Sequence, residues 1–375
     1  MKFENQSMPV MRKSSLPTAP AHVGGFHGAI NHPSLYLWDS WAYEEGGVTH
    51  LYTLALSRNL ADGTAIKPEE RNDYPFHFRH FISLDEGLTW TDEGSVLAPS
   101  NDAGSYYSRN VWSGSATVLP DGRKLMGFTG LRQVDAEHPF LQSIGFATSR
   151  DGVEFDHIHP TPLSCPRRDY DAILAAGYYL GPKNKLGDKD GEDGGPILAW
   201  RDPYTFVDHN GRIQCFWSAK ISPKVGVIAH ATLTETASGF EIETLHPPMT
   251  LPDGETITQA EVPKIYFDER AETYYCLISA CDRLFEGQDD SEVSKTLRLY
   301  TSSSLRGPWK SYRDGSPILE NLPNMFGASI LETDFEAGEF TLIAPITECA
   351  RPEDQLTIAR IQTMTIRPDD YASKS

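Results

Sequence analysis

Three acidic residues each lie within a short cluster of aromatic, basic or small polar residues: Asp39 in LYLWDSW, Asp202 in AWRDPY and Glu261 in TQAEVPK. Carboxylates gathered in one pocket raise each other's pKa and cost stability, so such a grouping is typical of catalytic sites. Glycoside hydrolysis uses one carboxylate as nucleophile or base, a protonated carboxyl as acid, and further groups that hold substrate hydroxyls. The alternative for any one residue is a structural role, for example Asp202 pairing with Arg201.

An internal repeat indicates how these residues could meet. Five segments beginning at Trp38, Trp112, Trp200, Ala260 and Met325 share one plan, in which a small polar cluster opens an apolar strand. A turn rich in Gly, Asp or Asn and a second apolar strand then follow in each segment. Each segment therefore predicts a β-hairpin led by a polar cluster.

The segment starts lie 60 to 88 residues apart, which leaves room for two more strands in every unit. The sequence therefore predicts an all-β fold, a five-bladed β-propeller with four-stranded antiparallel blades and a funnel-like central active site. We expect one catalytic domain over residues 1–375, with an N-terminal extension over about residues 1–30 and a flexible tail at 370–375. Arg79 and His80, in HFRHF, are interpreted as strand residues.

The innermost strands of a propeller line its central channel, so equivalent positions of distant segments converge on one axis. Asp39, Asp202 and Glu261 should therefore meet, and the other two segments place Ser113 and Phe326 at the same level. Two indole rings, Trp38 and Trp112, would offer apolar faces on which a sugar can stack. For Trp41 and Trp200 we favour a place in the core.

With these segments in view, the chain resembles family 68 of the glycoside hydrolases: levansucrases, inulosucrases and related β-fructofuranosidases. LYLWDSW looks like the nucleophile motif of that family, which implies that Asp39 forms a fructosyl-enzyme intermediate and that Trp38 lines the sugar pocket. VWSGSA is similar to the second motif and assigns Trp112 and Ser113 to fructosyl binding.

Two further segments carry the resemblance. WRDP resembles the third motif, which assigns Arg201 to substrate hydroxyls and Asp202 to transition-state stabilisation. TQAEVPKIYF resembles the acid/base region, which gives that role to Glu261 and makes Gln259 a neighbouring substrate contact. Family 32, which belongs to the same clan, usually shows Asn-Asp-Pro-Asn and Glu-Cys motifs, and neither occurs in this sequence.

The sequence departs from the family pattern beside the acid/base residue. Val262 stands where the family usually has an arginine, and Lys264 is expected to supply part of that charge and to bind substrate. Cys281, followed by Asp282 and Arg283, stands where a basic residue near the leaving sugar is expected. Hydrolysis and transfer of the fructosyl group both stay open, because the choice between them depends on acceptor subsites in loops.

Composition limits the classes of binding partner and the cellular compartment that we expect. The formal net charge of -19 disfavours nucleic acid and anionic membranes, and no apolar run of about 18 residues predicts a membrane span. The first residues lack a signal peptide, which predicts a cytoplasmic protein, although export without a leader would leave the same sequence. The expected partner is a small carbohydrate such as sucrose or another fructoside.

The sequence predicts no cofactor and no metal site. Its five cysteines are widely spaced and its twelve histidines show no metal-binding pattern. The acidic stretch Asp188–Gly195 has the spacing of a calcium loop but lacks the distal glutamate of an EF-hand, so a solvated loop is favoured. The pattern Ser83, Asp85, Gly87, Thr89 and Trp90 resembles an Asp-box turn, whose role is structural.

The resulting prediction is a retaining β-fructosyl hydrolase or transferase, with Asp39 as nucleophile, Glu261 as acid/base and Asp202 as transition-state stabiliser. Two alternatives remain. One is an inverting five-bladed propeller that cleaves another sugar polymer, of the arabinan or xylan type. The other is a propeller that binds a glycan without catalysis, because fold does not imply function.

Overall fold

The computed structural model of the chain describes residues 25–188, 197–285, 288–313, 315–322, 324–347 and 355–365. These residues are almost entirely β-structure and turns. The helical segments among them are α1 (Tyr170–Ala175) and short 3₁₀ turns at Pro68–Asp73, Lys183–Lys185, Gly254–Thr256 and Asp290–Glu292. None of the described helices is long and apolar enough to cross a membrane.

Five antiparallel sheets follow one another along the chain and form the blades. Blade 1 contains β1 (Phe26–His27), β2 (Leu35–Glu45), β3 (Val48–Ser57), β4 (His77–Ser83) and β5 (Thr89–Leu97). Blade 2 contains β6 (Asn110–Val118), β7 (Lys124–Arg132), β8 (Leu141–Ser149) and β9 (His157–Ile158). Blade 3 contains β10 (Arg201–Val207), β11 (Ile213–Ser222), β12 (Val225–Thr236) and β13 (Gly239–Leu245).

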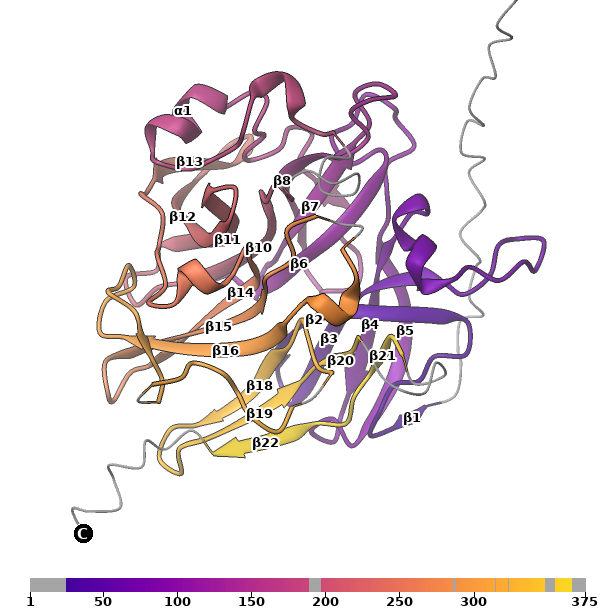
Figure 1. Cartoon of the computed structure of the whole chain (residues 1–375). Helices are drawn as coiled ribbons and strands as arrows, with labels where there is room; N and C mark the ends of the chain where they lie inside the picture. The colour runs from indigo at the N-terminus through magenta and orange to yellow at the C-terminus, as the bar shows by residue number, and fades with distance from the viewer. Residues whose placement is uncertain are drawn as a thin grey trace, which may run out of the picture.

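The last two blades complete the ring. Blade 4 contains β14 (Gln259–Asp268), β15 (Thr273–Cys281), β16 (Lys295–Ser302) and β17 (Lys310–Ser311). Blade 5 contains β18 (Ser329–Asp334), β19 (Glu339–Ile343) and β22 (Gln362–Thr365). A separate pair, β20 (Pro345–Ile346) and β21 (Thr357–Ile358), lies near β2 (Figure 1).

The prediction of a five-bladed, antiparallel propeller is confirmed, and its hairpins are the repeated segments. Blades 2, 3 and 4 have the expected four strands. Blade 1 gains the short fifth strand β1, whose residues Phe26 and His27 pair with β5, and blade 5 has three strands. In the β2–β3 hairpin, Gly46 and Gly47 form the turn at φ +62° and +79°, as a tight two-residue hairpin requires.

Each pair of neighbouring blades shares an apolar cluster. In the cluster shared by blades 1 and 2, Trp41 packs edge-on against Phe78, also of blade 1, with ring centroids 4.6 Å apart. In the cluster shared by blades 2 and 3, Trp200, which directly precedes blade 3, packs against Trp217 of blade 3 at 5.1 Å. Both Trp41 and Trp200 are 1% exposed, which confirms their predicted place in the core. Large aromatic residues thus help to fill the space between adjacent sheets.

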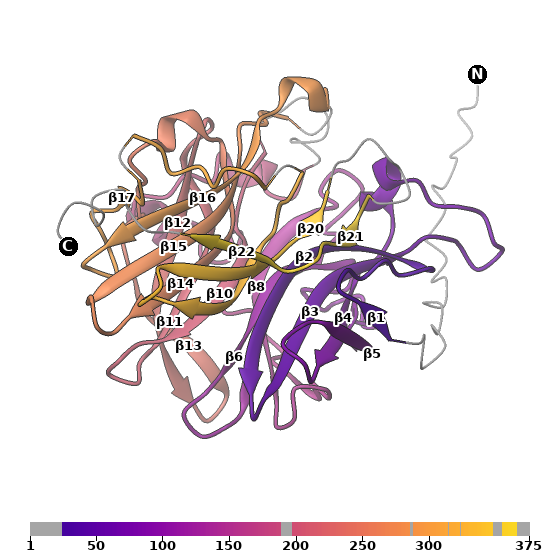
Figure 2. The ribbon, with the colours of Figure 1, turned by 90° about the horizontal axis from the view of Figure 1, so that it is seen from below.

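The ring closes where the end of the described chain returns to its start. Ile30 and Ile358 form an isolated antiparallel bridge, and the Leu37 amide donates to the Leu356 carbonyl at 2.8 Å. Ile358 is fully buried in a cluster with Leu35 and Ile343, which joins blade 5 to blade 1. Both ribbon views show the yellow strands of blade 5 beside the indigo strands of blade 1 (Figures 1 and 2).

The Asp-box turn has the structural role that was predicted. Ser83 Oγ accepts the Gly87 amide at 2.7 Å, and the Asp85 carboxylate accepts both the amide and the hydroxyl of Thr89. Trp90 is 1% exposed in the core of blade 1. These contacts fix the turn between β4 and β5, on the outer part of the blade.

We predict that Ile358→Ala will destabilise the protein by about 3 kcal/mol, because it leaves a cavity in a fully buried cluster at the ring closure. The measurement is denaturant unfolding followed by tryptophan fluorescence. Leu84→Ala is the control, because Leu84 is 75% exposed. Equal unfolding midpoints for the two variants would contradict the role assigned to this closure.

Candidate active site

A cavity of about 310 Å³ lies where the innermost strands converge. Eight of the nine residues predicted for the site line it: Trp38, Asp39, Trp112, Ser113, Arg201, Asp202, Gln259 and Glu261. Phe326, the residue of the fifth segment, lines it as well. The structure thus brings together residues separated by more than 200 positions, and the blade repeat is what aligns them.

A β-bulge interrupts the innermost strand of each of the first four blades near the cavity. The register shifts lie between Leu37 and Ser40, Trp112 and Gly114, Arg201 and Tyr204, and Glu261 and Lys264. A bulge adds a residue to one strand and turns its side chain away from the regular alternation. These bulges therefore direct the polar side chains toward the axis.

Two backbone conformations at the bulges are unusual. Asp202 has φ +61° and Val262 has φ +48°. Aspartate tolerates this left-handed region, but a β-branched valine is strained there. The Val262 amide donates to Asp202 Oδ2 at 3.3 Å, so the strained conformation directs a donor at a site carboxylate. Val262 thus contributes its backbone, where the family pattern has an arginine side chain.

Asp39 is held by the neighbouring blade. Ser113 Oγ donates to Asp39 Oδ2 at 2.5 Å. Burial raises the pKa of Asp39 above its usual value, while the hydrogen bond from Ser113 lowers it and the carboxylate of Glu261 raises it. The contact crosses from blade 2 to blade 1 and fixes the orientation of the carboxylate.

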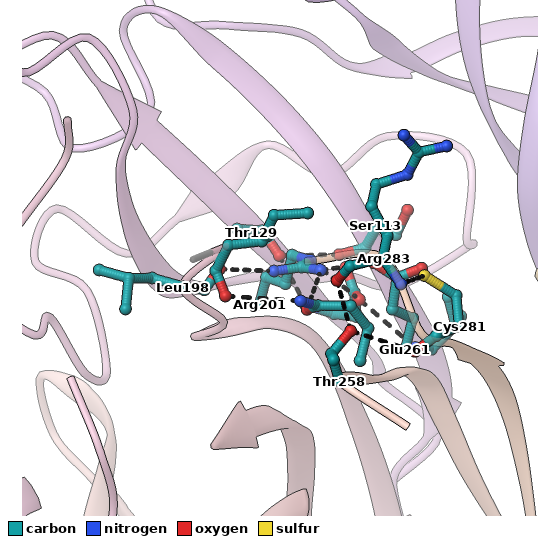
Figure 3. Close-up of polar contacts among 12 residues, drawn as sticks. Ser113, Thr129, Leu198, Arg201, Thr258, Glu261, Cys281 and Arg283 are labelled. Atoms are coloured by element: carbon teal, nitrogen blue, oxygen red, sulfur yellow. Dashed lines mark hydrogen bonds and ion pairs between the residues drawn. The ribbon is translucent and has the colours of Figure 1, made fainter. Parts of the chain in front are cut away.

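Arg201 organises the side of the cavity formed by blades 3 and 4. Its guanidinium donates to the Leu198 carbonyl at 2.8 Å, to Gln259 Oε1 at 2.9 Å and to Glu261 Oε1. Figure 3 shows Arg201 between Leu198 on one side and Glu261 on the other. Its Nε also lies 3.7 Å from Asp202 Oδ2. One buried cation therefore contacts two of the three carboxylates.

The three carboxylates differ in their surroundings. Burial raises the pKa of Asp202 to about 8; the Arg201 guanidinium lowers it, whereas Glu261 and Asp39 raise it. The side chain of Asp202 is 5% exposed and that of Glu261 is 22% exposed. Asp202 is therefore the enclosed member of the group, and Glu261 is reachable from the cavity.

Lys264 is the predicted site residue that does not line the cavity. It is 2% exposed, and its ammonium donates to the backbone carbonyl of Ser40 at 2.9 Å and to that of Ala328. Burial lowers the pKa of Lys264 to about 7, while Asp39 and Asp202 act to raise it. Its charge therefore lies behind the carboxylates, away from where substrate would bind.

Aromatic rings line one side of the cavity. Trp38 and Trp112 are half-buried in its wall. Trp112 stacks on Phe140 with ring centroids 6.0 Å apart, and Trp38 packs edge-on against Phe76 at 5.2 Å. The supporting rings hold both indoles in place.

Other wall residues were not identified from the sequence. They include Arg71, Asn72, Phe140, Gln142, Lys295, Thr347 and Gln355. Most lie in connections or near the ends of strands, outside the repeated positions, so no internal comparison points to them. Cys281 and Arg283, which were noted in the sequence, also line the cavity; burial raises the pKa of the Cys281 thiol to about 12, and its sulfur accepts the Arg283 amide at 3.4 Å.

The acidic loop near the cavity mouth is described only at its first residue. Asp188 lines the cavity and pairs with His138 at 3.0 Å and with Lys185 at 2.8 Å. The rest of the stretch considered for calcium, residues 189–195, lies outside the described residues. Within the described parts of the chain, no three His, Cys, Asp or Glu side chains are placed to hold a metal ion. Cys165, Cys215, Cys276 and Cys281 are free.

No protein-family profile and no curated protein matches the sequence. Solved structures match over most of the chain. An inulosucrase from Halalkalicoccus jeotgali bound to kestose is 19% identical, with 89% of this chain and 86% of that chain covered and a TM-score of 0.58. Bacillus subtilis levansucrase is 14% identical, with 91% and 86% covered and a TM-score of 0.59.

A levansucrase variant complexed with sucrose is also similar, at 14% identity, with 89% of this chain and 85% of that chain covered and a TM-score of 0.59. At these identities the similarity shows a common propeller fold. Any conclusion about chemistry has to come from the residues of this chain.

We predict that Asp202→Asn will raise the melting temperature, and by more at pH 8.5 than at pH 5. The folded-state pKa of Asp202 is raised to about 8, so its contribution to stability is complete below the unfolded pKa and is lost as pH rises through the folded pKa. Asparagine removes that loss and keeps an acceptor for the Val262 amide. The measurement is thermal unfolding of both proteins across this pH range, and a gain independent of pH would contradict the enclosed position of Asp202.

Proposed function

We propose that the protein is a retaining β-fructosyl hydrolase or transferase that acts on sucrose or related β-fructosides. The observation that carries the proposal is the meeting of Asp39, Asp202 and Glu261, from three blades, in one cavity lined by Trp38 and Trp112. The fold is shared with an inulosucrase bound to kestose and with a levansucrase complexed with sucrose. Two carboxylates and a supporting third are the groups that a retaining glycosidase uses.

In the first step, an Asp39 oxygen attacks the anomeric carbon of the fructosyl group. The bond from that carbon to the leaving oxygen breaks, and Glu261 gives its proton to this oxygen. In the second step, the oxygen of a water molecule or of a sugar hydroxyl attacks the anomeric carbon. Glu261 takes the proton from that attacking group. The ester bond to Asp39 then breaks, and both carboxyl groups return to their starting states.

Asp202 is suited to hold substrate hydroxyls and to stabilise the transition state. It is enclosed, and burial raises its pKa to about 8. A positive charge on the sugar ring favours the ionised form of a nearby carboxyl group. The interaction of Asp202 with the ring therefore strengthens as the transition state forms, which is the requirement for catalysis.

Arg201 and the aromatic rings position the reactants. Arg201 fixes the Glu261 side chain through a direct contact and is itself held by Leu198 and Gln259. The exposed part of Glu261 is consistent with exchange of a proton with solvent between the two steps. Trp38 and Trp112 provide apolar faces for the sugar.

We predict that the wild-type protein releases glucose from sucrose or a related β-fructoside. Asp39→Ala should lose activity, and Glu261→Gln should reduce kcat by about 10²–10⁴-fold, the usual contribution of a general acid/base. Glu332→Gln, which changes an exposed residue of β18, is the matched control and should retain activity. The measurement is chromatography of glucose, fructose and fructosyl oligomers over time.

Product composition and stereochemistry complete this experiment. Equal amounts of glucose and fructose indicate hydrolysis, and excess glucose with oligomers indicates transfer. Proton-decoupled carbon NMR of the first product should show retained anomeric configuration. Inversion would favour the arabinan- or xylan-type alternative, and inactivity on all fructosides would contradict the proposal.

We predict that Ser113→Ala will move the acidic limb of the kcat/KM profile to higher pH. The hydrogen bond from Ser113 lowers the pKa of Asp39, so its loss raises the pKa of the nucleophile, which is then protonated at higher pH. Ser115→Ala is the matched control, because Ser115 is buried on the same strand but accepts the Thr205 amide instead. An acidic limb unchanged in Ser113→Ala would argue against Asp39 as the titrating nucleophile.

A further inference from the structure

Lys264 joins three blades beneath the cavity. It belongs to β14 of blade 4, and its ammonium donates to the Ser40 carbonyl of blade 1 and to the Ala328 carbonyl next to blade 5. The Ser329 hydroxyl donates to the same Ser40 carbonyl at 2.6 Å. A buried ammonium is costly unless it is well paired. Its burial at 2% exposure is therefore compensated by contacts that hold the three blades together.

Both carbonyls belong to residues next to the contact between Asp39 and Gly327. Ser40 follows Asp39, and Ala328 follows Gly327. The Gly327 carbonyl accepts the Ser40 amide at 3.0 Å, and its own amide donates to Ser279 Oγ at 2.7 Å. A Cβ added to Gly327 would lie 2.1 Å from Asp39 Oδ1. The Asp39 carboxylate thus packs directly against the blade 5 backbone that Lys264 holds.

The charge of Lys264 also acts on the carboxylates. Burial raises the pKa of Asp39, and Lys264 and Arg201 both oppose that effect. In return, Asp39 and Asp202 favour the charged form of Lys264 against the effect of burial. Glu261 is the other charged group that acts on Asp39, and it raises the pKa. Lys264 is therefore a second buried cation that stabilises the ionised nucleophile.

We propose that Lys264 is a positioning residue for Asp39, which holds blades 1, 4 and 5 beneath the nucleophile and places a positive charge behind its carboxylate. The proposal rests on the proposed role of Asp39. Because Lys264 does not line the cavity, it acts through Asp39 and not by contact with substrate.

The test is Lys264→Met, which keeps the length and apolar stem but removes the charge and the donors. The expected result is a loss in kcat of about 10²-fold, the size caused by slight misplacement of a reacting group, with KM changed less than about threefold. The acidic limb of the pH profile should also move to higher pH. A merely structural role would produce neither this division between kcat and KM nor the pH shift.

Lys124→Met is the matched control. Lys124 is 5% exposed and likewise donates to two backbone carbonyls, those of Gly122 and Arg150, and it lies in blade 2 outside the cavity wall. It also pairs with Glu45 at 2.8 Å. Its loss should lower the melting temperature without moving the acidic limb. An equal effect of both variants on kcat and on the pH profile would overturn the proposal.

Gly327→Ala tests the same contact if Lys264→Met does not fold. The added methyl group would press on Asp39, so kcat should fall by about 10²-fold or more. Gly46→Ala is its control, because Gly46 has nearly the same φ, +62° against +64°, and open space around its Cβ position. If Gly327→Ala kept the kcat of Gly46→Ala, the close packing of blade 5 on Asp39 would have no catalytic importance.

A stability measurement separates this proposal from the proposed function. Melting temperatures of Lys264→Met, Asp39→Asn and the double variant are compared without substrate. If Lys264 compensates the carboxylate, its loss lowers the melting temperature less in the Asp39→Asn background. This coupling is measurable even if the wild-type protein is inactive on fructosides, which would refute only the proposed function. Additive melting temperatures, with unchanged kcat and pH profile wherever activity exists, would overturn the proposal for Lys264.

Discussion

Three carboxylates share one buried cavity, and their repulsion is the constraint on which the centre of this molecule depends. Burial and mutual repulsion raise the pKa of Asp39 and Asp202, and such an arrangement is stable only with compensating charge. Arg201 supplies positive charge from one side, where its guanidinium contacts Glu261 and Asp202. Lys264 supplies it from beneath, outside the cavity wall. The two cations differ in that Arg201 lines the cavity and Lys264 does not.

The blade architecture makes this arrangement possible because it is rigid. Apolar clusters fill the space between neighbouring sheets, and the chain end bridges to Ile30 to close the ring. Against this frame, bulges in the innermost strands turn side chains toward the axis, and Val262 is held at an unfavourable φ of +48°. Such local strain persists only where the surrounding structure fixes the backbone. The packing between the blades therefore offsets the unfavourable free energy of the backbone strain and the buried charges at the centre.

The structure shows what the residues that depart from the family pattern contact. The Val262 amide donates to Asp202 Oδ2, and the ammonium of Lys264, which was expected to supply the missing charge, is directed away from the cavity. Cys281 leaves the wall beside Glu261 with a weakly polar thiol, and Arg283 is the basic residue nearest to it in sequence that lines the cavity. The motifs around Asp39 and Ser113 thus match those that the sequence resembles, and the surroundings of Glu261 are built from different groups.

The sequence alone was sufficient for the five hairpins and for eight of the residues that line the cavity, because a repeat places equivalent positions on one axis and motif order preserves that alignment. It also identified Trp41 and Trp200 as core residues from their type. Only the tertiary structure decided the direction of Lys264, because a bulge between Glu261 and Lys264 breaks the alternation that would otherwise assign its face. The same holds for Phe140, Gln142 and Arg283, which come from connections and strand ends whose place in space depends on contacts between blades and not on local pattern.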